Sequence, residues 1–270
     1  MPKASSDLAV RRAEPRDEAA AANLWYGAFP EDGPEYALAF MRNFDSERVG
    51  IAATLGGETV GAAQLLYGTE LVPRSGGSAR LGYLYAVCVA EAHRGLGIGK
   101  AITRYAAEVS REAGCRAVGT IPARRGLHSY YAALGFNEIV AVTERRFAAQ
   151  TVPAEITRLT DAEYNAAREA RLAHAAHVRF SAAWLRFTGA DYIRIAVPDV
   201  GNAIAAVTDG GIAELLCAAG DERAFAGAVA ANRKLGTITA RFPAAESGGA
   251  RPFALISGAA ADYWGFALDM

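Results

Sequence analysis

The sequence has few cysteines, few histidines and almost no net charge. Three cysteines and four histidines occur in 270 residues, and no two cysteines have C-x-x-C spacing, so neither a disulfide framework nor a zinc site is predicted. A net charge of −1 offers no basic footprint for nucleic acid or an anionic membrane. The chain has no run of about 18 purely apolar residues and does not open with the apolar segment of a signal peptide. We therefore expect a soluble, cytoplasmic protein without a metal.

The composition is that of a chain with sizeable cores, since 52% of the residues are hydrophobic and 21% are charged. The length suits one large domain or two of ordinary size. Residues 1–7 are small and polar and are predicted to form a disordered tail. A break at QTVP, residues 150–153, separates two expected domains, 8–150 and 155–270.

The first domain is predicted to be α+β, with a mixed, mostly antiparallel central sheet flanked by helices. Apolar residues that recur every three or four positions indicate helices, and alternation or short apolar runs indicate strands. Gly135 is placed to take the left-handed conformation that ends a helix, with Phe136 packing back. The expected strands are 8–12, 49–55, 59–67, 79–89, 115–122 and 138–147, and the expected helices are 15–25, 34–44, 98–113 and 126–136.

The second domain is predicted to be smaller and also α+β. Residues 161–187 are expected to be mainly helical, with His174 and His177 as a solvated pair rather than metal ligands. TDGG, residues 208–211, indicates a hairpin, and the C-terminal DYWGFALDM, residues 262–270, is expected to dock as a final strand. The order of strand, helix and strand repeats that of the first domain. Further strands are expected at 191–197, 202–207, 212–217, 237–242 and 253–258, and a helix at 221–236.

The stretch RGLGIGK, residues 94–100, follows a predicted strand and opens a predicted helix. Glycines at positions 95, 97 and 99 leave backbone amides open to an anion, and the positive end of the helix dipole would add attraction. Arg94 and Lys100 would add charge-assisted hydrogen bonds. The spacing matches neither the nucleotide P-loop nor the dinucleotide fingerprint. An anion site and a purely structural turn remain open at this point.

Three ordered motifs together resemble the GNAT acetyltransferase superfamily over residues 8–148: HRGLGIGKAI after a strand, then GCRAVGTIP, then LHSYYAALGF. The resemblance implies that the loop amides hold the pyrophosphate of acetyl-CoA, the co-substrate. It also implies that the preceding strand offers main-chain groups to the pantetheine arm where two central strands splay apart. The cofactor-binding residues that it implies are Val87, Cys88, Val89, Arg94, Gly95, Leu96, Gly97, Ile98, Gly99 and Lys100.

Tyr131 occupies the tyrosine position of the Y-x-x-x-G-F motif, and the resemblance implies that it protonates the departing thiolate of coenzyme A. A phenol, with a pKa of about 10, is protonated at neutral pH and can serve as that acid. The alternative is that Tyr131 only packs beneath its helix. Tyr130 should face about 100° away and lie in the core, and His128 is expected on the surface. The asparagine that many family members carry before this tyrosine is absent, with Arg124 near its place.

The acceptor side is less marked in the sequence. Glu31, Asp32 and Glu35 lie in a loop that borders the acceptor site in the family, and each is otherwise a solvated acid. Tyr83 and Tyr85 share a strand face with Val87 by period-two alternation and would line the acceptor cleft or pack against a helix. Cys88 is expected to be a buried structural thiol.

We expect an acetyl-CoA-dependent N-acetyltransferase in which a primary amine attacks the thioester directly. The alternatives are a catalytically silent acetyl-CoA-binding regulatory or scaffold protein, and a loop that serves a different phosphate ligand such as a nucleotide. We expect the acceptor to be a small-molecule amine rather than a protein, and we expect neither nucleic acid nor a membrane as partner. The second domain looks like a degenerate copy of the fold without a phosphate loop, and would wall the acceptor cleft or form a homodimer surface.

Overall fold

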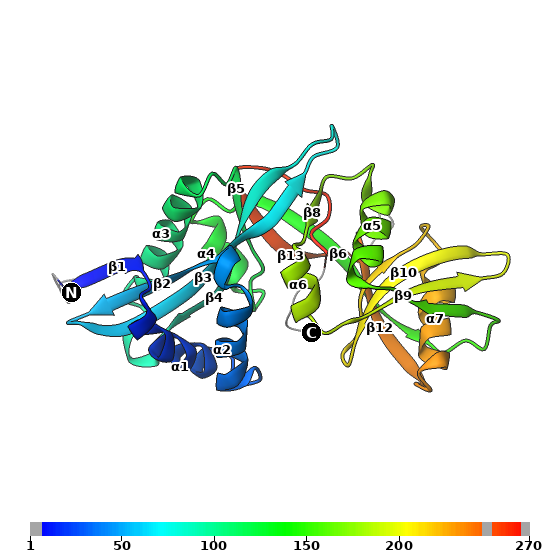
Figure 1. Ribbon diagram of the computed structural model, residues 1–270, viewed down its shortest axis with the longest axis horizontal. Helices are drawn as coiled ribbons and strands as arrows, with labels where there is room; N and C mark the ends of the chain where they lie inside the picture. Colours follow the sequence, from blue (N-terminus) through cyan, green and yellow to red (C-terminus); the bar gives the residue numbers. More distant parts are fainter. Residues whose placement is uncertain (1–6, 245–249, 266–270) are drawn as a thin grey trace. The chain divides into compact units, whose positions relative to one another are not determined.

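The computed structural model describes residues 7–244 and 250–265, so that residues 1–6 of the predicted tail lie outside the described residues. The chain packs into two compact units (Figure 1). Unit 1 takes residues 1–70, 79–138 and 255–259, and unit 2 takes residues 71–78, 139–254 and 260–270. The predicted domain boundary near residue 150 stays a prediction.

Unit 1 is built on a mixed sheet in which most neighbours are antiparallel. β1 (Leu8–Arg12), β2 (Arg48–Leu55) and β3 (Glu58–Val72) pair antiparallel in sequence order, and β3 lies beside β4 (Ala79–Val89). β4 then pairs in parallel with β5 (Ala117–Thr120). The last neighbour of β5 comes from far along the chain, since the end of β13 (Ala250–Ser257) lies antiparallel to it. The predicted α+β class with a largely antiparallel sheet is confirmed.

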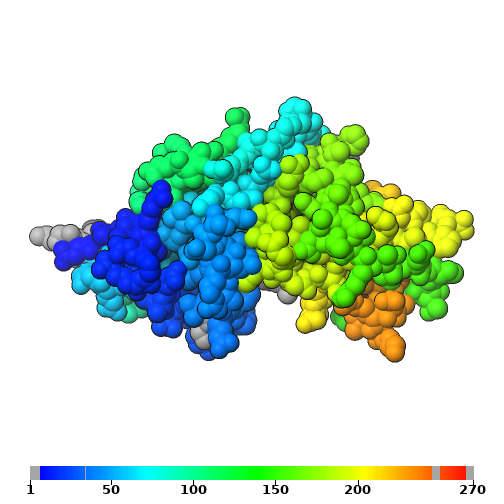
Figure 2. All heavy atoms as spheres, viewed as in Figure 1, coloured from blue at the N-terminus to red at the C-terminus, as the bar shows by residue number. Residues whose placement is uncertain are grey.

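Helices cover both faces of this sheet. α3 (Ile98–Glu112) buries Ile98, Ile102, Ala106 and Val109 against the strands, as its apolar spacing predicts, and α4 (Leu127–Ala132) adds Tyr131 to the same cluster. The opposite face carries α1 (Glu18–Ala28) and α2 (Gly33–Asn43) (Figure 1). In the space-filling view these two blue helices form much of the visible surface of unit 1 (Figure 2). Single 3₁₀ turns lie at Pro15–Asp17, Asp45–Glu47 and Glu91–His93.

Aromatic rings fill the layer between α1, α2 and β4. The ring centroids of Trp25 and Tyr85 are 5.4 Å apart, and those of Phe40 and Tyr85 are 4.9 Å apart in a stacked arrangement. Trp25 and Phe40 are buried. Offset or edge contacts of this kind are worth about 0.5–1.5 kcal/mol each beyond the burial of the ring area, so they fix the two helices on the sheet.

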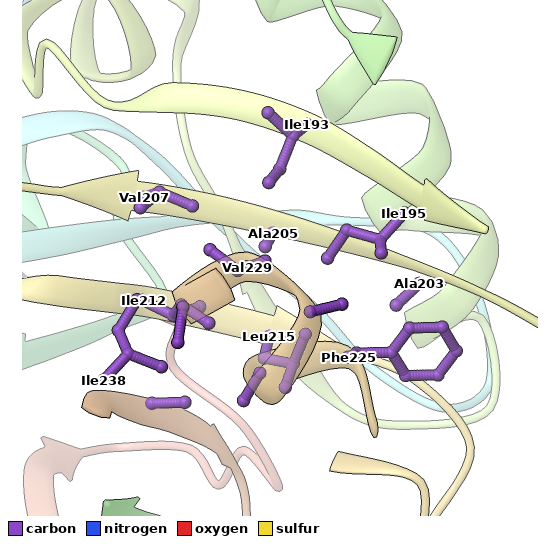
Figure 3. Packing of buried hydrophobic residues seen from close by; sticks show 14 of the residues in the cluster. Ile193, Ile195, Ala203, Ala205, Val207, Ile212, Leu215, Phe225, Val229 and Ile238 are labelled. Carbon is purple, nitrogen blue, oxygen red and sulfur yellow. The ribbon is translucent and has the colours of Figure 1, made fainter. Parts of the chain in front are cut away.

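Unit 2 repeats the order of three antiparallel strands, a helix and a parallel strand. β9 (Asp191–Val197), β10 (Gly201–Thr208) and β11 (Gly211–Leu216) are antiparallel, and β12 (Thr237–Pro243) pairs in parallel with β11 at Ile212 and Ala240. α7 (Glu222–Asn232) joins β11 to β12 and points Phe225 and Val229 at the sheet (Figure 3). The outer neighbours are β6 (Glu138–Ala148) on β12 and β7 (Glu155–Arg158) on β9.

One expectation for the second half, that His177 is solvated, is wrong. Residues 161–187 are mainly helical as expected, in α5 (Asp161–Leu172) and α6 (Ala182–Phe187), but the short strand β8 (His177–Arg179) lies between the two helices. His177 is therefore buried rather than solvated, and its imidazole hydrogen-bonds Ala175 O at 2.8 Å and Glu169 Oε2 at 3.2 Å. Of the segment expected as a final strand, residues 262–265 form one isolated bridge, from Tyr263 to His177, and residues 266–270 lie outside the described residues.

A buried ion pair explains part of this arrangement. Arg168 of α5 and Glu214 of β11 are fully buried, and Arg168 Nε donates to Glu214 Oε2 at 2.9 Å. Tyr164 Oη donates to the same carboxylate. Arg168 also donates to the carbonyl of Val178 at 2.8 Å, which ties β8 to α5. Charges that are buried this deeply need such partners.

Candidate active site

The glycine loop has the open geometry that its sequence predicts. Gly95 and Gly97 both have φ of +83°, and a Cβ added to either would meet no atom within 4 Å. Gly97 is the N-cap of α3, and the first helical hydrogen bond runs from Ala101 N to Gly97 O at 3.0 Å. The N–H groups of the first turn precede that bond and point out of the helix end. The loop therefore presents backbone donors at the positive end of a helix.

Two cationic side chains and a histidine flank the loop. Arg94 Nε donates to the carbonyl oxygen of Val89 at 3.2 Å, which anchors the arginine to the end of β4. Lys100 belongs to the first turn of α3, and His93 ends the preceding 3₁₀ turn. All three line one cavity. An anion that binds the backbone donors would thus meet positive charge on both sides of the loop.

β4 carries a bulge just before the loop. Ala86 has φ of +50°, a left-handed conformation that alanine rarely adopts. Tyr85 packs against Trp25 on the face of α1, whereas Leu84 and Val87 both pack with the cluster beneath α3. The expectation that Tyr83 and Tyr85 share a face with Val87 is therefore wrong. The extra residue at the bulge reverses the alternation and turns the strand end toward α3.

The sheet opens at the same level. Parallel pairing of β4 with β5 ends at Tyr83 and Gly119. One residue further on, Thr120 Oγ1 donates to Leu84 O at 3.0 Å, so a side chain takes the place of a ladder bond. Parallel pairing between these two central strands therefore stops before β4 ends at Val89, as the splay that the resemblance implies requires.

A cavity of 530 Å³ lies where the bulge, the splay and the loop meet. Cys88 and Leu96, two of the predicted cofactor-binding residues, do not line it. Three residues that were not predicted as contacts do: His93, Leu127 and Tyr130. The predicted residues that line it are Val87, Val89, Arg94, Gly95, Gly97, Ile98, Gly99, Lys100 and Tyr131.

Tyr131 reaches this cavity from α4 and is itself buried, with 6% of its surface exposed. Burial raises the pKa of the Tyr131 phenol well above its usual value, the neighbouring Tyr130 adds to the shift, and the Thr120 side chain opposes it. Phe136 packs edge-on against Tyr131 with centroids 5.6 Å apart, after Gly135 turns the chain with φ of +94°. The left-handed cap and the returning phenylalanine are as expected.

Tyr130 is not the core residue that a 100° rotation predicts. It is half-buried, and its hydroxyl lies so near the first turn of α3 that a Cβ built on Gly99 would be 3.1 Å from the hydroxyl oxygen. Burial raises the pKa of Tyr130, and the Thr103 side chain opposes that shift. The first turn of α3 and the two tyrosines of α4 therefore close one side of the cavity together.

Cys88 is a structural thiol. It is 3% exposed, and its Sγ donates to the carbonyl of Ala62 at 3.4 Å. Burial raises the pKa of the thiol to about 12, so the thiolate that a nucleophile requires is scarce at neutral pH.

The predicted acceptor residues lie on the other face of the sheet. Asp32 caps α2 and accepts a hydrogen bond from Trp25 Nε1 at 2.7 Å, and partial burial raises the pKa of its carboxyl, with the Glu31 charge adding to the shift. Tyr83 and Tyr85 pack edge-on at 5.5 Å. None of these four residues lines the 530 Å³ cavity, and neither do Arg124 and His128.

The described residues show neither a metal-binding group nor a membrane-spanning helix. Within 7–244 and 250–265, no three His, Cys, Asp or Glu side chains are grouped so that they could hold a metal ion. Over the same residues no helix is long and apolar enough to cross a bilayer.

Part of this chain matches a known family in sequence, and nearly all of it matches solved structures in fold. Residues 19–136 match the family model described as Acetyltransferase (GNAT) family, whereas no curated protein matches the sequence. Three crystal structures share the fold over more than nine-tenths of the chain. A GCN5-related N-acetyltransferase from Kribbella flavida is 16% identical, with a TM-score of 0.65 over 93% of this chain and 70% of that one. The counterpart from Anabaena variabilis is 11% identical (TM-score 0.66, 92% and 72%), and Eis1 from Mycobacterium abscessus is 15% identical (TM-score 0.62, 93% and 73%). This chain therefore contains an acetyltransferase domain of the GNAT family, which spans residues 19–136.

Proposed function

We propose that the protein is an acetyl-CoA-dependent N-acetyltransferase that transfers an acetyl group to a primary amine. One observation carries the proposal: the open glycine loop at the start of α3 and the buried phenol of Tyr131 line the same cavity. A purely structural turn would need the glycines but would not need a buried phenol and two cationic side chains, Arg94 and Lys100, around one hollow. The family match supports an acyltransferase.

The residues around the loop fit acetyl-CoA. The space beside Gly95 and Gly97 is free of protein atoms, and a pyrophosphate there would accept hydrogen bonds from backbone amides of the loop and first turn. Arg94 and Lys100 would balance its charge. The main-chain groups of residues 87–89 would hold the pantetheine arm in the splay. Acetyl-CoA supplies an acyl group activated as a thioester.

The chemistry assigned to Tyr131 is that of a general acid. When the amine nitrogen forms its bond to the carbonyl carbon, the carbon–sulfur bond breaks and its electron pair goes to sulfur. The Tyr131 phenol gives its proton to that sulfur, and the acceptor nitrogen loses a proton to solvent, from which the phenolate is reprotonated. A pKa raised by burial keeps the phenol protonated at neutral pH. It also means that the phenolate lasts only briefly.

For the acceptor we propose a small amine that approaches through the region of Asp32, Glu31, Tyr83 and Tyr85. A half-buried carboxylate that accepts a hydrogen bond from the indole N–H of Trp25 is a suitable environment for a cation. The balanced surface charge of the chain favours a small molecule over a partner held by a broad charged surface.

For unit 2 we propose a degenerate copy of the same core without a cofactor site. Its strand–helix–strand β11–α7–β12 parallels β4–α3–β5. The five residues between β11 and α7, CAAGD, hold one glycine, whereas the eight residues between β4 and α3, AEAHRGLG, hold two, and a third, Gly99, follows in the first turn of α3. The proposed copy therefore keeps the architecture and lacks the row of open amides.

The test is a panel of amines assayed with acetyl-CoA by detection of the released thiol, with wild type and Tyr131→Phe in parallel. We expect turnover by wild type and a loss of about 10²-fold or more in kcat for Tyr131→Phe, with acetyl-CoA affinity unchanged. Acetyl-CoA binding without turnover of any amine would favour the silent regulatory or scaffold protein. Equal turnover by both proteins would remove Tyr131 from the mechanism.

A further inference from the structure

The third glycine of the loop serves a different purpose from the first two. Gly95 and Gly97 have positive φ and open space around them, whereas Gly99 lies inside α3 and a Cβ built on it would be 3.1 Å from the Tyr130 hydroxyl oxygen. Non-bonded heavy atoms prefer separations of about 3.5–4.0 Å, so an alanine at this position would crowd that oxygen. The lack of a side chain at Gly99 therefore makes room for the Tyr130 hydroxyl.

The Tyr130 hydroxyl lies toward the open end of α3. A Cα–Cβ bond in a helix tilts toward the N-terminus of that helix, so an oxygen beside the Cβ position of Gly99 lies near the free N–H groups of the first turn. The next neighbour of that position, at 3.8 Å, is Cγ2 of Val89, the last residue of β4. Val89, Gly99 and Tyr130 all line the 530 Å³ cavity. The hydroxyl therefore shares a wall of this cavity with the backbone donors of α3.

The ring of Tyr130 is held in place from two sides. It packs edge-on against the ring of Tyr131, with centroids 5.0 Å apart, and it packs against the apolar cluster beneath α3. Because the protein already fixes the ring, the hydroxyl needs little further ordering when a ligand arrives.

We propose that Tyr130 is a phosphate-binding residue whose hydroxyl donates a hydrogen bond to the pyrophosphate of coenzyme A at the start of α3. This inference rests on the proposed function. The oxygens of an ionised pyrophosphate can only accept hydrogen bonds, and a phenol that keeps its proton can donate one. Tyr130 thus adds an uncharged donor to the two cationic side chains, Arg94 and Lys100. The neighbouring phenols of α4 then serve different ends of the cofactor, Tyr130 the pyrophosphate and Tyr131 the sulfur.

Tyr105 provides a matched control. It is a tyrosine of α3, and it is partly buried against the same apolar cluster as Tyr130. Unlike Tyr130, it does not line the cavity. Tyr105→Phe therefore removes a hydroxyl beside the same cluster and leaves the cavity unchanged.

Calorimetric titration with coenzyme A measures the effect of the hydroxyl, and the ³¹P spectrum of bound coenzyme A locates it. Tyr130→Phe should weaken binding by about 10-fold, the lower end of the range for one hydrogen bond to a charged group. It should also move the two pyrophosphate signals of bound coenzyme A and leave the 3′-phosphate signal in place. Tyr105→Phe should match wild type in both measurements.

Gly99→Ala tests the same contact from the side of α3. Its methyl group should displace the Tyr130 hydroxyl and weaken coenzyme A binding by a similar factor. In a Tyr130→Phe background the crowded oxygen is gone, so Gly99→Ala should cause little further loss. Losses that multiply in the double variant would show that the methyl group acts on the ligand directly, and would contradict the pairing of Gly99 with Tyr130.

The outcomes separate the two proposals. Wild type that fails to bind coenzyme A refutes the proposed function and this inference with it. Wild type that binds coenzyme A, with a Tyr130→Phe variant of equal affinity and unmoved pyrophosphate signals, refutes the role of Tyr130 alone. A loss of affinity without movement of those signals, or an equal loss in Tyr105→Phe, would reduce Tyr130 to a packing residue.

Discussion

Alanine at Gly97 and alanine at Gly114 should weaken the fold equally and should differ sharply in their effect on coenzyme A binding. The two glycines lie at opposite ends of α3, Gly97 with φ of +83° and Gly114 with φ of +75°. A Cβ at either position would meet no atom within 4 Å. The structure thus offers two sites with the same backbone strain and no steric clash within the protein, of which only one faces the cavity.

The magnitudes follow from these geometries. An L-residue in the left-handed region costs about 1–2 kcal/mol, so each variant should lower the unfolding midpoint by about 2–4 °C per kcal/mol. At Gly97 the new methyl group would also displace a pyrophosphate from a backbone amide. A hydrogen bond to a charged group is worth about 1.5–3 kcal/mol, which is about 10- to 150-fold in Kd.

Thermal unfolding and calorimetric titration with coenzyme A measure the two effects separately. Gly97→Ala should lose both stability and affinity, and Gly114→Ala should lose stability alone. Affinity that is unchanged in both variants would refute the account of the loop as an anion cradle. A loss of affinity in Gly114→Ala as large as in Gly97→Ala would show that strain in α3, and not access to the amides, controls binding.

Three further predictions concern stability. Glu214→Gln leaves the buried Arg168 guanidinium with Glu169, 3.6 Å away, as its remaining counter-charge and should cost up to about 3–5 kcal/mol in denaturant unfolding, with coenzyme A affinity unchanged. A loss below about 1 kcal/mol would contradict the role of Glu214 as the main partner of that buried charge. Ala86→Val should be markedly destabilising because a β-branched residue tolerates φ of +50° poorly, whereas Ala86→Gly should be neutral or stabilising by up to about 1 kcal/mol; the reverse order would argue against the bulge. The Arg11 guanidinium holds the pKa of Asp17 at about 2, below its unfolded value of about 3.9, so the pair stabilises the fold above about pH 4 and this contribution is lost as pH falls toward 2. The gap in unfolding free energy between wild type and Asp17→Asn, about 2 kcal/mol near neutral pH, should therefore close in acid, and a constant gap would show that the charge is not responsible.

The parts of the site that local chemistry dictates could be predicted from the sequence. Glycines at alternate positions before a helix predict an open loop because only the lack of a Cβ permits those backbone angles. Gly135 followed by Phe136 predicts a left-handed cap in the same way. The position of Tyr131 beside that cap follows from the motif that contains it.

The bulge could not be predicted, because alanine carries no signal for a positive φ. Ala86 adopts φ of +50° only because the surrounding strands over-determine it. Strict alternation therefore placed Tyr85 and Val87 on one face, and the extra residue puts them on opposite faces. The hydrogen bond from the Thr120 hydroxyl to Leu84 O could not be predicted either, because the sequence does not indicate where the pairing of β4 with β5 ends.

Pairing between distant segments is the other feature that the sequence does not announce. β5 has as its outer neighbour residues 255–257 of β13, and β12 has β6. The apolar pattern of each strand indicates that the strand is buried, but it does not indicate which strand lies beside it. The helix predicted at 221–236 shows the same limit, because its sequence indicates a helix but does not indicate the register between β11 and β12, the two strands that the helix joins.

The most direct test of the central claim is calorimetric titration of the purified protein with acetyl-CoA, coenzyme A and ATP. The account predicts saturable binding of acetyl-CoA and coenzyme A, no competition by ATP, and loss of binding in an Arg94→Ala, Gly97→Val double variant. Unchanged affinity in that double variant, or ATP that binds at the same site as coenzyme A, would contradict the assignment of the loop to the pyrophosphate of coenzyme A.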